Sequence, residues 1–582
     1  MRTPRLLITA AAALALLATG AAAEPSTAAA QPPAAQPVAA PSVASSASAT
    51  LTARVAPTRV VAAKKVSRVN LKIDAKAGRH PISRLIYGVN FAGQTAGLSS
   101  AFRVPVDRWG GNSTSRYNYR NDTYNTGQDW YYENIVADPS DTLTAFVDKD
   151  RTTGTASLVT VPMIGWVAKD SPADHPFTCS FPRTSFASQN DFDPWDSNCG
   201  NGMSGSTQLS ADPSTTSISV GADFDHDLVA SLVSRYGTAA QGGVKFYALD
   251  NEPVLWNSTH RDVHPDPLTS DELWTKSQAT AQAVKSADGT ASVLGPSDWG
   301  WCAYYFSAAD ECGQSSADRD AHGGLPLGAW YLQQFATAER SGGVRLLDYF
   351  DEHFYPQAAN VALSSKGSAA TQALRLRSTR ALWDPSYVDE SWISDANGRK
   401  PLQWIRTMKA WVNQYYPGTK TAITEYNWGG LESMNGALAQ ADVLGIFGRQ
   451  GLDLATLWGP TKASDPWAYA FRMYLNYDGR HHGFGTTSVQ ATSGNQGRLA
   501  VYAAVRGSDG ALTVMVINKT GSTIPSTLSL AGFAGASKAA VYRYSSAHPK
   551  SIVKLASVKR HGSKITTRFP GSSITLLVLP KR

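Results

Sequence analysis

The feature that most constrains the fold of this chain is a pattern repeated eight times between residues 86 and 458. Each repeat has a short apolar run that ends in polar or aromatic residues, and longer segments of helical periodicity separate the runs. Eight βα units in succession predict an α/β fold, a parallel (β/α)8 TIM barrel. The expected strands span residues 86–91, 106–110, 158–165, 244–250, 292–296, 347–355, 420–426 and 452–458.

Local signals support the helices between these strands. Thr269 and Glu272 have the spacing of a capping box at the start of a helix. Apolar residues recur at three-residue spacing over 438–447, before Gly451 ends the run. The apolar run 244–249 is nearly continuous, which is typical of a parallel strand buried on both faces.

After residue 479 the periodicity changes from helical to alternating. The segments 499–505 and 512–518 are separated by a Ser-Asp-Gly turn, and the segments 539–544 and 573–579 resemble them. This part predicts an additional antiparallel β-sandwich domain. An alternating segment at 69–74 is expected to join it. We therefore divide the folded chain into an N-terminal strand region (66–84), a catalytic barrel (85–480) and a β-sandwich (481–582).

The N-terminal segment predicts export. Arg2 and Arg5 precede a short apolar run, and Ala21–Ala23 supply small residues for signal-peptidase cleavage. A membrane anchor is the alternative, but the run is shorter than the roughly 20 residues that span a bilayer. We expect a signal peptide at 1–23, a disordered Ala/Pro/Ser-rich leader at 24–65, and a secreted, extracellular protein without a membrane partner.

The four cysteines fit an extracellular location. They form two pairs that are close in the sequence, which predicts the disulfides Cys179–Cys199 and Cys302–Cys312. A zinc site is the alternative, but the sequence contains no CxxC motif. Acidic residues on the loops could hold a structural calcium ion, although no EF-hand spacing is present.

The net charge of +7 suggests nucleic-acid binding until the charges are located. Residues 1–65 contain six Lys or Arg and one Glu, so this segment contributes +5 and the remainder only +2. A nearly balanced body lacks the concentrated basic face that nucleic acids require. We therefore expect a monomer with no nucleic-acid partner.

Two glutamates follow directly on predicted strands. Glu252 comes after the fourth strand, and Glu425 lies at the end of the seventh. Because the C-terminal ends of parallel barrel strands share one rim, both side chains are expected at a common mouth. Glycoside cleavage needs two carboxyl groups, one protonated and one ionised, on either side of one acetal. The pair therefore predicts a glycosidase. The alternative is a purely structural role, in which either glutamate caps a helix or forms a surface ion pair.

Neighbouring residues suggest how the two glutamates are tuned. Arg108, at the end of the second strand, is the candidate that keeps Glu425 ionised. Asn251, next to Glu252, is placed to bond a sugar hydroxyl. His353 is expected either to bond a sugar or to orient a carboxylate, although a buried structural histidine is an equal alternative.

Five segments together resemble glycoside hydrolase family 44, the endoglucanases and xyloglucanases. The similar segments occur in order at residues 108–112, 129–134, 249–256, 353–357 and 424–430. The resemblance implies a (β/α)8 barrel joined to a β-sandwich, retention of anomeric configuration, and cleavage inside β-1,4-glucan chains. It assigns Glu252 as the general acid/base and Glu425 as the nucleophile, with no cofactor required for catalysis.

The chain is rich in aromatic residues, with 16 Trp and 23 Tyr. Pyranose rings stack on such side chains, so an endo-acting cleft needs several of them, although core packing is an equal alternative for each one. The expected substrate-binding residues are Arg108, Trp109, Asn112, Asn251, Trp299, Trp301, His353, Tyr355, Trp428 and Trp458.

We therefore expect a polysaccharide partner, a β-glucan such as cellulose or xyloglucan. A carbohydrate-binding protein without catalysis is one alternative. A retaining barrel hydrolase that acts on xylan or mannan is another. The preferred polymer depends on loop shape, which the sequence does not specify.

Overall fold

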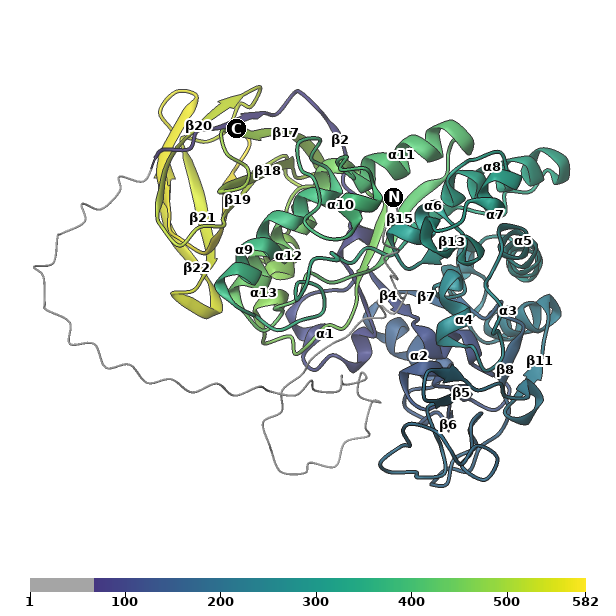
Figure 1. Cartoon of the computed structure of the whole chain (residues 1–582). Helices are drawn as coiled ribbons and strands as arrows, with labels where there is room; N and C mark the ends of the chain where they lie inside the picture. The colour runs from purple at the N-terminus through teal and green to yellow at the C-terminus, as the bar shows by residue number, and fades with distance from the viewer. Residues whose placement is uncertain (1–66) are drawn as a thin grey trace, which may run out of the picture.

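A computed structural model describes residues 67–582 of the chain. The expected signal peptide and leader lie outside the described residues. Two bodies lie side by side, a barrel formed by most of the chain and a β-sandwich that holds both the first strand and the last (Figure 1). Within residues 67–582, no helix is both long and apolar enough to cross a membrane.

Eight parallel strands close the barrel in the order β12-β13-β14-β15-β16-β3-β4-β7, which confirms the predicted fold. Neighbouring strands pair in parallel around the whole ring. Each expected strand forms, in most cases as a shorter segment than the apolar run that predicted it. The strands are β3 (Gly88–Asn90), β4 (Val106–Trp109), β7 (Ala156–Val161), β12 (Phe246–Leu249), β13 (Ser292–Asp298), β14 (Tyr349–Glu352), β15 (Lys420–Tyr426) and β16 (Leu454–Leu457).

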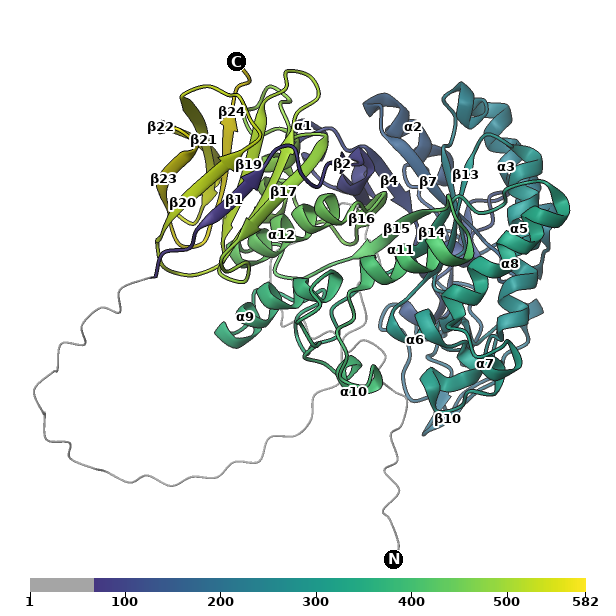
Figure 2. The same ribbon diagram turned by 90° about the horizontal axis from the view of Figure 1, so that it is seen from above.

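A core of inward-facing side chains fills the barrel. Phe246, Tyr349 and Leu454, with five other apolar residues, form a buried cluster inside the ring, as expected for a packed barrel rather than a pore. Helices surround the strands (Figure 2). The main ones are α2 (Leu143–Thr153), α3 (Ala222–Tyr236), α5 (Ser270–Ala287), α8 (Leu327–Gly342), α9 (Ala369–Ser378), α11 (Trp404–Tyr415), α12 (Met434–Gln450) and α13 (Pro466–Leu475), and the short ones are α1 (Leu98–Ala101), α4 (Trp256–Thr259), α6 (Trp301–Tyr305), α7 (Ala317–Ala321) and α10 (Ile393–Ala396).

Two of these helices show how local sequence sets their limits. Helix α5 begins after Thr269, whose hydroxyl accepts a hydrogen bond from the Glu272 amide at 3.2 Å, so the predicted helix start is confirmed. Helix α12 ends at Gly451, which adopts the left-handed conformation (φ 65°) that favours glycine. Helix α12 is buried over most of its length because it packs between the barrel and the sandwich.

The sandwich contains ten strands, hydrogen-bonded in the continuous order β22-β21-β24-β19-β18-β17-β1-β20-β23, with β2 paired to β17. The chain's first strand, β1, joins it as predicted and pairs with β17 in antiparallel and with β20 in parallel orientation. All other strand pairs in the sandwich are antiparallel. The strands are β1 (Leu71–Asp74), β2 (His80–Pro81), β17 (Thr487–Ser493), β18 (Leu499–Val505), β19 (Leu512–Asn518), β20 (Ile524–Ala531), β21 (Lys538–Ser545), β22 (His548–Lys559), β23 (Lys564–Phe569) and β24 (Ser573–Leu579).

Long loops with short hairpins extend the barrel. The hairpins are β5 (Thr123–Asn125) with β6 (Asn134–Val136) and β9 (Met203–Ser204) with β10 (Thr207–Gln208), and β8 (Trp166–Ala168) pairs in antiparallel orientation with the distant β11 (Ser217–Ser219). Both predicted disulfides form, Cys179–Cys199 with a Cα–Cα distance of 5.8 Å and Cys302–Cys312 with 4.8 Å. The first disulfide closes the loop that follows β8, which we call the disulfide loop (residues 177–201).

Candidate active site

Glu252 lies on a tight turn three residues after β12 ends. Both Asp250 (φ 63°) and Glu252 (φ 48°) adopt the left-handed conformation, which is costly for residues other than glycine. The Asp250 carboxylate holds the turn, because it accepts hydrogen bonds from the backbone amides of Met163 (2.5 Å), Ile164 (3.0 Å) and Asn251 (2.7 Å). The turn therefore presents Glu252 at the barrel mouth.

Glu425 is the last residue but one of β15. Its Oε1 lies 2.5 Å from Arg108 Nη1, and its Oε2 accepts a hydrogen bond from the Tyr355 hydroxyl at 2.8 Å. The Arg108 guanidinium is fully buried and also donates to Asn251 Oδ1 at 2.8 Å. A buried guanidinium at this distance stabilises a negative carboxylate. Arg108 thus occupies the place beside Glu425 that the sequence suggested.

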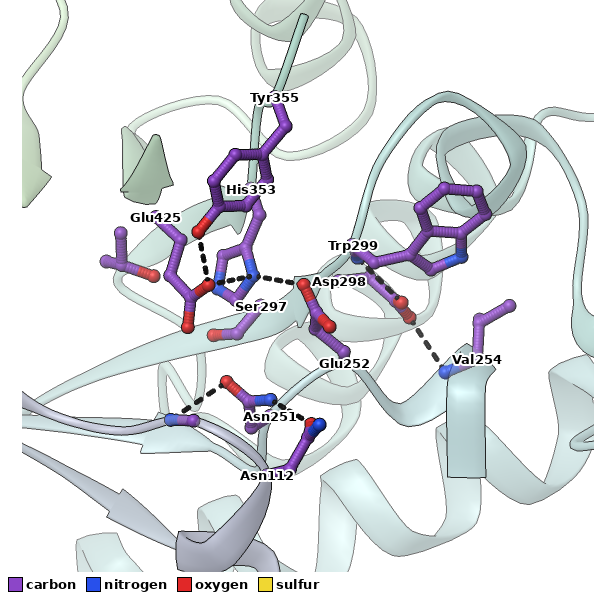
Figure 3. Close-up of polar contacts among 12 residues, drawn as sticks. Asn112, Asn251, Glu252, Val254, Ser297, Asp298, Trp299, His353, Tyr355 and Glu425 are labelled. Atoms are coloured by element: carbon purple, nitrogen blue, oxygen red, sulfur yellow. Dashed lines mark hydrogen bonds and ion pairs between the residues drawn. The ribbon is translucent and has the colours of Figure 1, made fainter. Parts of the chain in front are cut away.

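The two glutamates converge on one point of the mouth (Figure 3). One carboxylate oxygen of each lies within 4.8 Å of the other. His353 lies between them, with Nδ1 2.8 Å from Glu252 Oε1 and 3.6 Å from Glu425 Oε2. The imidazole therefore contacts the Glu252 carboxyl directly, as the expected role of orienting a carboxylate requires.

Burial gives these groups different protonation states at neutral pH. Burial raises the pKa of Glu252 to about 7, although the Arg108 charge opposes the shift. Burial also lowers the pKa of His353 to about 4, so the imidazole is neutral. The site thus combines one carboxyl that holds a proton near neutral pH with one carboxylate paired to arginine. This combination can protonate a leaving group and stabilise or attack a developing cation.

Asn251 and Asn112 connect Glu252 to the loop beside the mouth. Asn251 Oδ1 accepts hydrogen bonds from Arg108 and from the Gly111 amide at 3.2 Å, and its Nδ2 donates to Asn112 Oδ1 at 3.1 Å. An amide NH2 has two hydrogens, so Asn251 keeps one for a ligand. Asn112 Nδ2 donates in turn to both oxygens of Asp129 at 3.1 Å.

The predicted aromatic platforms fall into four groups. Trp299 and Trp458 are partly exposed, as a sugar platform requires, whereas Trp109 and Trp301 are nearly buried. Tyr355 is partly exposed but points its hydroxyl at Glu425. Trp428 is only 1% exposed and donates from Nε1 to Ser378 Oγ at 3.1 Å. The expectation for Trp428 was wrong, because its side chain points away from the mouth into the core.

Sequence reasoning missed three residues that lie near the site. Asp129 contacts Asn112, as described above, and Trp130 follows it in the chain. The Trp130 and Trp195 rings lie 5.2 Å apart between centroids, and Trp195 is 64% exposed. Trp130 lies inside one of the five family-like segments, which could have identified it. Trp195 lies in the disulfide loop, where no local signal marks it.

Two groups of residues in the described part of the chain have the spacing of metal ligands. One is Glu252, His353 and Glu425, the site itself. The other is Glu133, Asp196 and Cys199, but the Cys199 sulfur is bound in a disulfide. Asp193 lies next to this second group. Burial raises the pKa of the Glu133 carboxyl, and the neighbouring Asp193 raises it further, to about 9.

A parallel barrel with two converging acidic groups at its C-terminal mouth, one protonated and one paired with arginine, defines a glycoside hydrolase of the barrel type. The comparisons with known proteins agree. The family model described as glycoside hydrolase family 44 matches residues 123–358. Endoglucanase A of Paenibacillus lautus is 34% identical over 82% of this chain and 67% of its own length.

Solved structures give the same result. CelM2, a bifunctional glucanase-xylanase from a metagenome library, is 41% identical with a TM-score of 0.83, over 88% of this chain and 99% of its own. A family 44 endoglucanase of Clostridium acetobutylium is 30% identical with a TM-score of 0.74, over 89% of this chain and 100% of its own. The chain belongs to glycoside hydrolase family 44 and is a glycoside hydrolase. A β-mannanase/endoglucanase A of Caldicellulosiruptor saccharolyticus is 32% identical over 78% of this chain, which spans only 34% of that relative.

Proposed function

We propose that this protein is a secreted, retaining endo-β-1,4-glycanase that cleaves internal bonds of β-glucans such as cellulose or xyloglucan. Glu425 is the nucleophile and Glu252 the general acid/base. The observation that carries the proposal is the proximity of the two carboxyl groups, because one oxygen of each lies within 4.8 Å of one oxygen of the other. Retaining enzymes hold their carboxyl groups about 5–5.5 Å apart, whereas inverting enzymes leave about 6.5–9.5 Å for a water molecule.

The reaction proceeds in two displacements. Glu252 gives its proton to the glycosidic oxygen as the bond from that oxygen to the anomeric carbon breaks, and Glu425 forms an ester with this carbon. The shortened sugar chain leaves as an alcohol. Glu252, now ionised, then removes a proton from water, whose oxygen attacks the anomeric carbon and releases Glu425. The anomeric configuration is inverted twice and therefore retained.

Three residues support these steps. Arg108 and the Tyr355 hydroxyl bind the two oxygens of Glu425 and hold its carboxylate for attack. Neutral His353 contacts Glu252, which must lose and regain a proton in each turnover. Because the pKa of Glu252 lies at about 7, both transfers are feasible near neutral pH.

Relatives support β-1,4-glucans as substrates. A family 44 xyloglucanase of Paenibacillus polymyxa, solved with xyloglucan, is 29% identical with a TM-score of 0.72 and covers 88% of this chain and 100% of its own. CelM2 is described as a glucanase-xylanase, so xylan is a second candidate substrate. Partly exposed Trp299 and Trp458 and the Trp130–Trp195 pair provide stacking faces for several sugar units.

The test uses β-glucan, xyloglucan, xylan and mannan, with the anomeric configuration of the first products followed by NMR. We expect retained configuration and activity on at least one β-glucan. Glu425→Ala and Glu252→Ala should each lower kcat by orders of magnitude. Glu432→Ala, which changes an exposed glutamate, is the matched control and should leave kcat unchanged. Inverted products, or turnover within a few-fold of wild type in either variant, would refute the mechanism.

Export and a structural calcium ion are also proposed. The apolar N-terminal run supports export, as do the two disulfides. Calcium would bind at Glu133, Asp193 and Asp196, because buried Glu133 Oε1 and Asp193 Oδ2 have no hydrogen-bond partner in the described structure. Removing calcium with EDTA should then lower Tm, and Glu133→Gln should abolish the effect. An unchanged Tm on EDTA treatment of wild type would exclude the ion.

A further inference from the structure

The near balance of charge in the folded chain conceals two halves of opposite sign. Residues 510–582 contain 11 Lys and Arg and no Asp or Glu. Since residues 66–582 sum to +2, residues 66–509 carry −9. The expectation of an evenly balanced body, without a concentrated basic part, was therefore wrong. The acid-free segment runs from β19 to the C-terminus and forms most of the sandwich.

Much of this charge lies along one edge of the sandwich. Strand β22 is the last strand at one end of the strand order and β23 the last at the other, and a short turn at residues 560–563 joins them (Figure 2). At about 3.3 Å per residue, the 12 residues of β22 extend over roughly 40 Å. The exposed cations on these strands and on the start of β21, here called the cationic edge, are Lys538, Lys550, Lys554, Lys559, Lys564 and Arg568.

No carboxylate within the described residues neutralises the cationic edge. None of its six side chains forms an ion pair there, whereas the buried Lys519 of the same segment pairs with Asp442 at 2.5 Å. Lys538 and Lys559 even lie directly opposite each other in the β21–β22 ladder. Like charges in that position destabilise a sheet. Folding stability therefore does not explain this arrangement, but a bound polyanion would.

The composition of the edge indicates which kind of polyanion fits. Residues 510–582 contain no Trp, and of their aromatic side chains only Phe533 and Tyr542 are partly exposed, so the surface offers few platforms for stacking nucleobases or neutral sugar rings. Five of its six cations are lysines, whose flexible single charges do not impose the paired geometry of arginine and can each meet one charge along a polymer. Dispersed carboxylates on a long polymer match such a row of lysines.

We propose that the cationic edge docks the enzyme on a polysaccharide that carries uronic acids. The negative barrel repels the same polymer, so the anionic polysaccharide is an anchor and not the substrate. Docking would hold the catalytic half within mixed polysaccharide material that also contains its neutral substrate, and so raise the local substrate concentration. This inference goes beyond the proposed hydrolysis and does not depend on which neutral polymer is cleaved.

The test measures binding of the full-length protein to polygalacturonate by affinity gel electrophoresis, with neutral xyloglucan and duplex DNA as the other ligands. We expect the mobility to fall in polygalacturonate and to recover in about 0.5 M salt, where screening reduces the Debye length to a few Å. The triple variant Lys550→Gln, Lys559→Gln, Lys564→Gln should bind about tenfold more weakly, because each exposed ion pair contributes about a factor of two to binding.

A matched control removes the same charge elsewhere. Lys245, Lys400 and Lys420 are exposed lysines of the barrel, and their replacement by Gln should leave binding to polygalacturonate unchanged. Equal losses in both triple variants would show a net-charge effect and overturn the proposal. The proposal would also be overturned if the wild-type protein bound DNA as tightly as polygalacturonate, or if it did not bind polygalacturonate. Hydrolysis of soluble neutral glucan should be the same in all three proteins, and if wild type hydrolyses nothing, only the proposed function fails.

Discussion

Arg108 has more influence on this site than any other residue that does not react. Its buried guanidinium contacts Glu425 directly and reaches the Glu252 turn through Asn251. The same charge opposes the effect of burial on the pKa of Glu252. One cation therefore pairs with Glu425 and keeps the pKa of Glu252 from rising further.

The pKa of Glu252 predicts the alkaline side of the pH profile. The first displacement needs protonated Glu252, and the protonated fraction falls as pH rises through about 7. We expect kcat/KM to decrease tenfold per pH unit well above that value. The measurement is kcat/KM on a soluble glucan between about pH 5 and 9. If kcat/KM began to fall only above pH 9, a group other than Glu252 would be the acid.

At the scale of elements, the barrel strands could be predicted because parallel strands buried on both faces leave continuous apolar runs, as in residues 244–249. The ends of these runs also placed Glu252, Glu425 and Arg108 at one mouth. The direction in which a side chain points was harder to predict. Trp428 follows β15 closely, yet its ring enters the core, because position along a strand does not determine where a loop side chain points.

The disulfide loop and the cationic edge were missed for a different reason. Trp195 reaches Trp130 only because the folded loop carries it there, a tertiary contact between residues 65 positions apart. The net charge of the folded chain does not reveal the cationic edge, because the negative charge of the barrel cancels the positive charge of the sandwich in the sum. Neither property is local in sequence.

The exposed Trp195 ring should matter for long substrates only. Trp195→Ala removes one face of the Trp130–Trp195 pair, at the far end of the contacts that lead from Asn251 through Asn112 and Asp129. We expect KM for a polymer to rise about three- to tenfold, as the loss of one aromatic contact implies, with little change for a short oligosaccharide. Val344→Ala, at an exposed residue between α8 and β14, is the control. Equal effects on both substrates would contradict a distal sugar contact.

The β21–β22 ladder predicts a stabilising substitution. Lys559→Gln removes the repulsion with Lys538 opposite it and should increase the free energy of unfolding by about 0.2–1 kcal/mol. Urea denaturation at low salt measures this gain, which should shrink in high salt because the repulsion is then screened. Lys550→Gln is the control, since in the β21–β22 register only Lys559 faces another lysine. A loss of stability in Lys559→Gln would contradict a destabilising repulsion between Lys538 and Lys559.

At the scale of the whole molecule, the barrel and the sandwich share one hydrophobic core. The largest buried cluster includes barrel residues such as Phe447 and sandwich residues such as Ile517 and Leu576. A polar contact crosses the same interface. Asp442 of α12 accepts from Lys519 at 2.5 Å and from Tyr502 at 2.7 Å, both in the sandwich. The two bodies should therefore unfold together, in one calorimetric transition.

The buried ion pair tests this coupling. Lys519 and Asp442 are only 3% and 2% exposed, so Lys519→Met leaves a carboxylate buried without its cation. We expect a loss of about 3–5 kcal/mol, since removing one partner of a buried pair leaves an uncompensated charge. The double variant Lys519→Met, Asp442→Leu should recover part of that loss, because no charge is then buried unpaired, although the Tyr502 and Thr379 hydroxyls lose their acceptor. If Lys519→Met split the transition in two, or lowered only a sandwich transition, the bodies would be independent. A single transition at a lower Tm, partly restored in the double variant, is the result that a shared core requires.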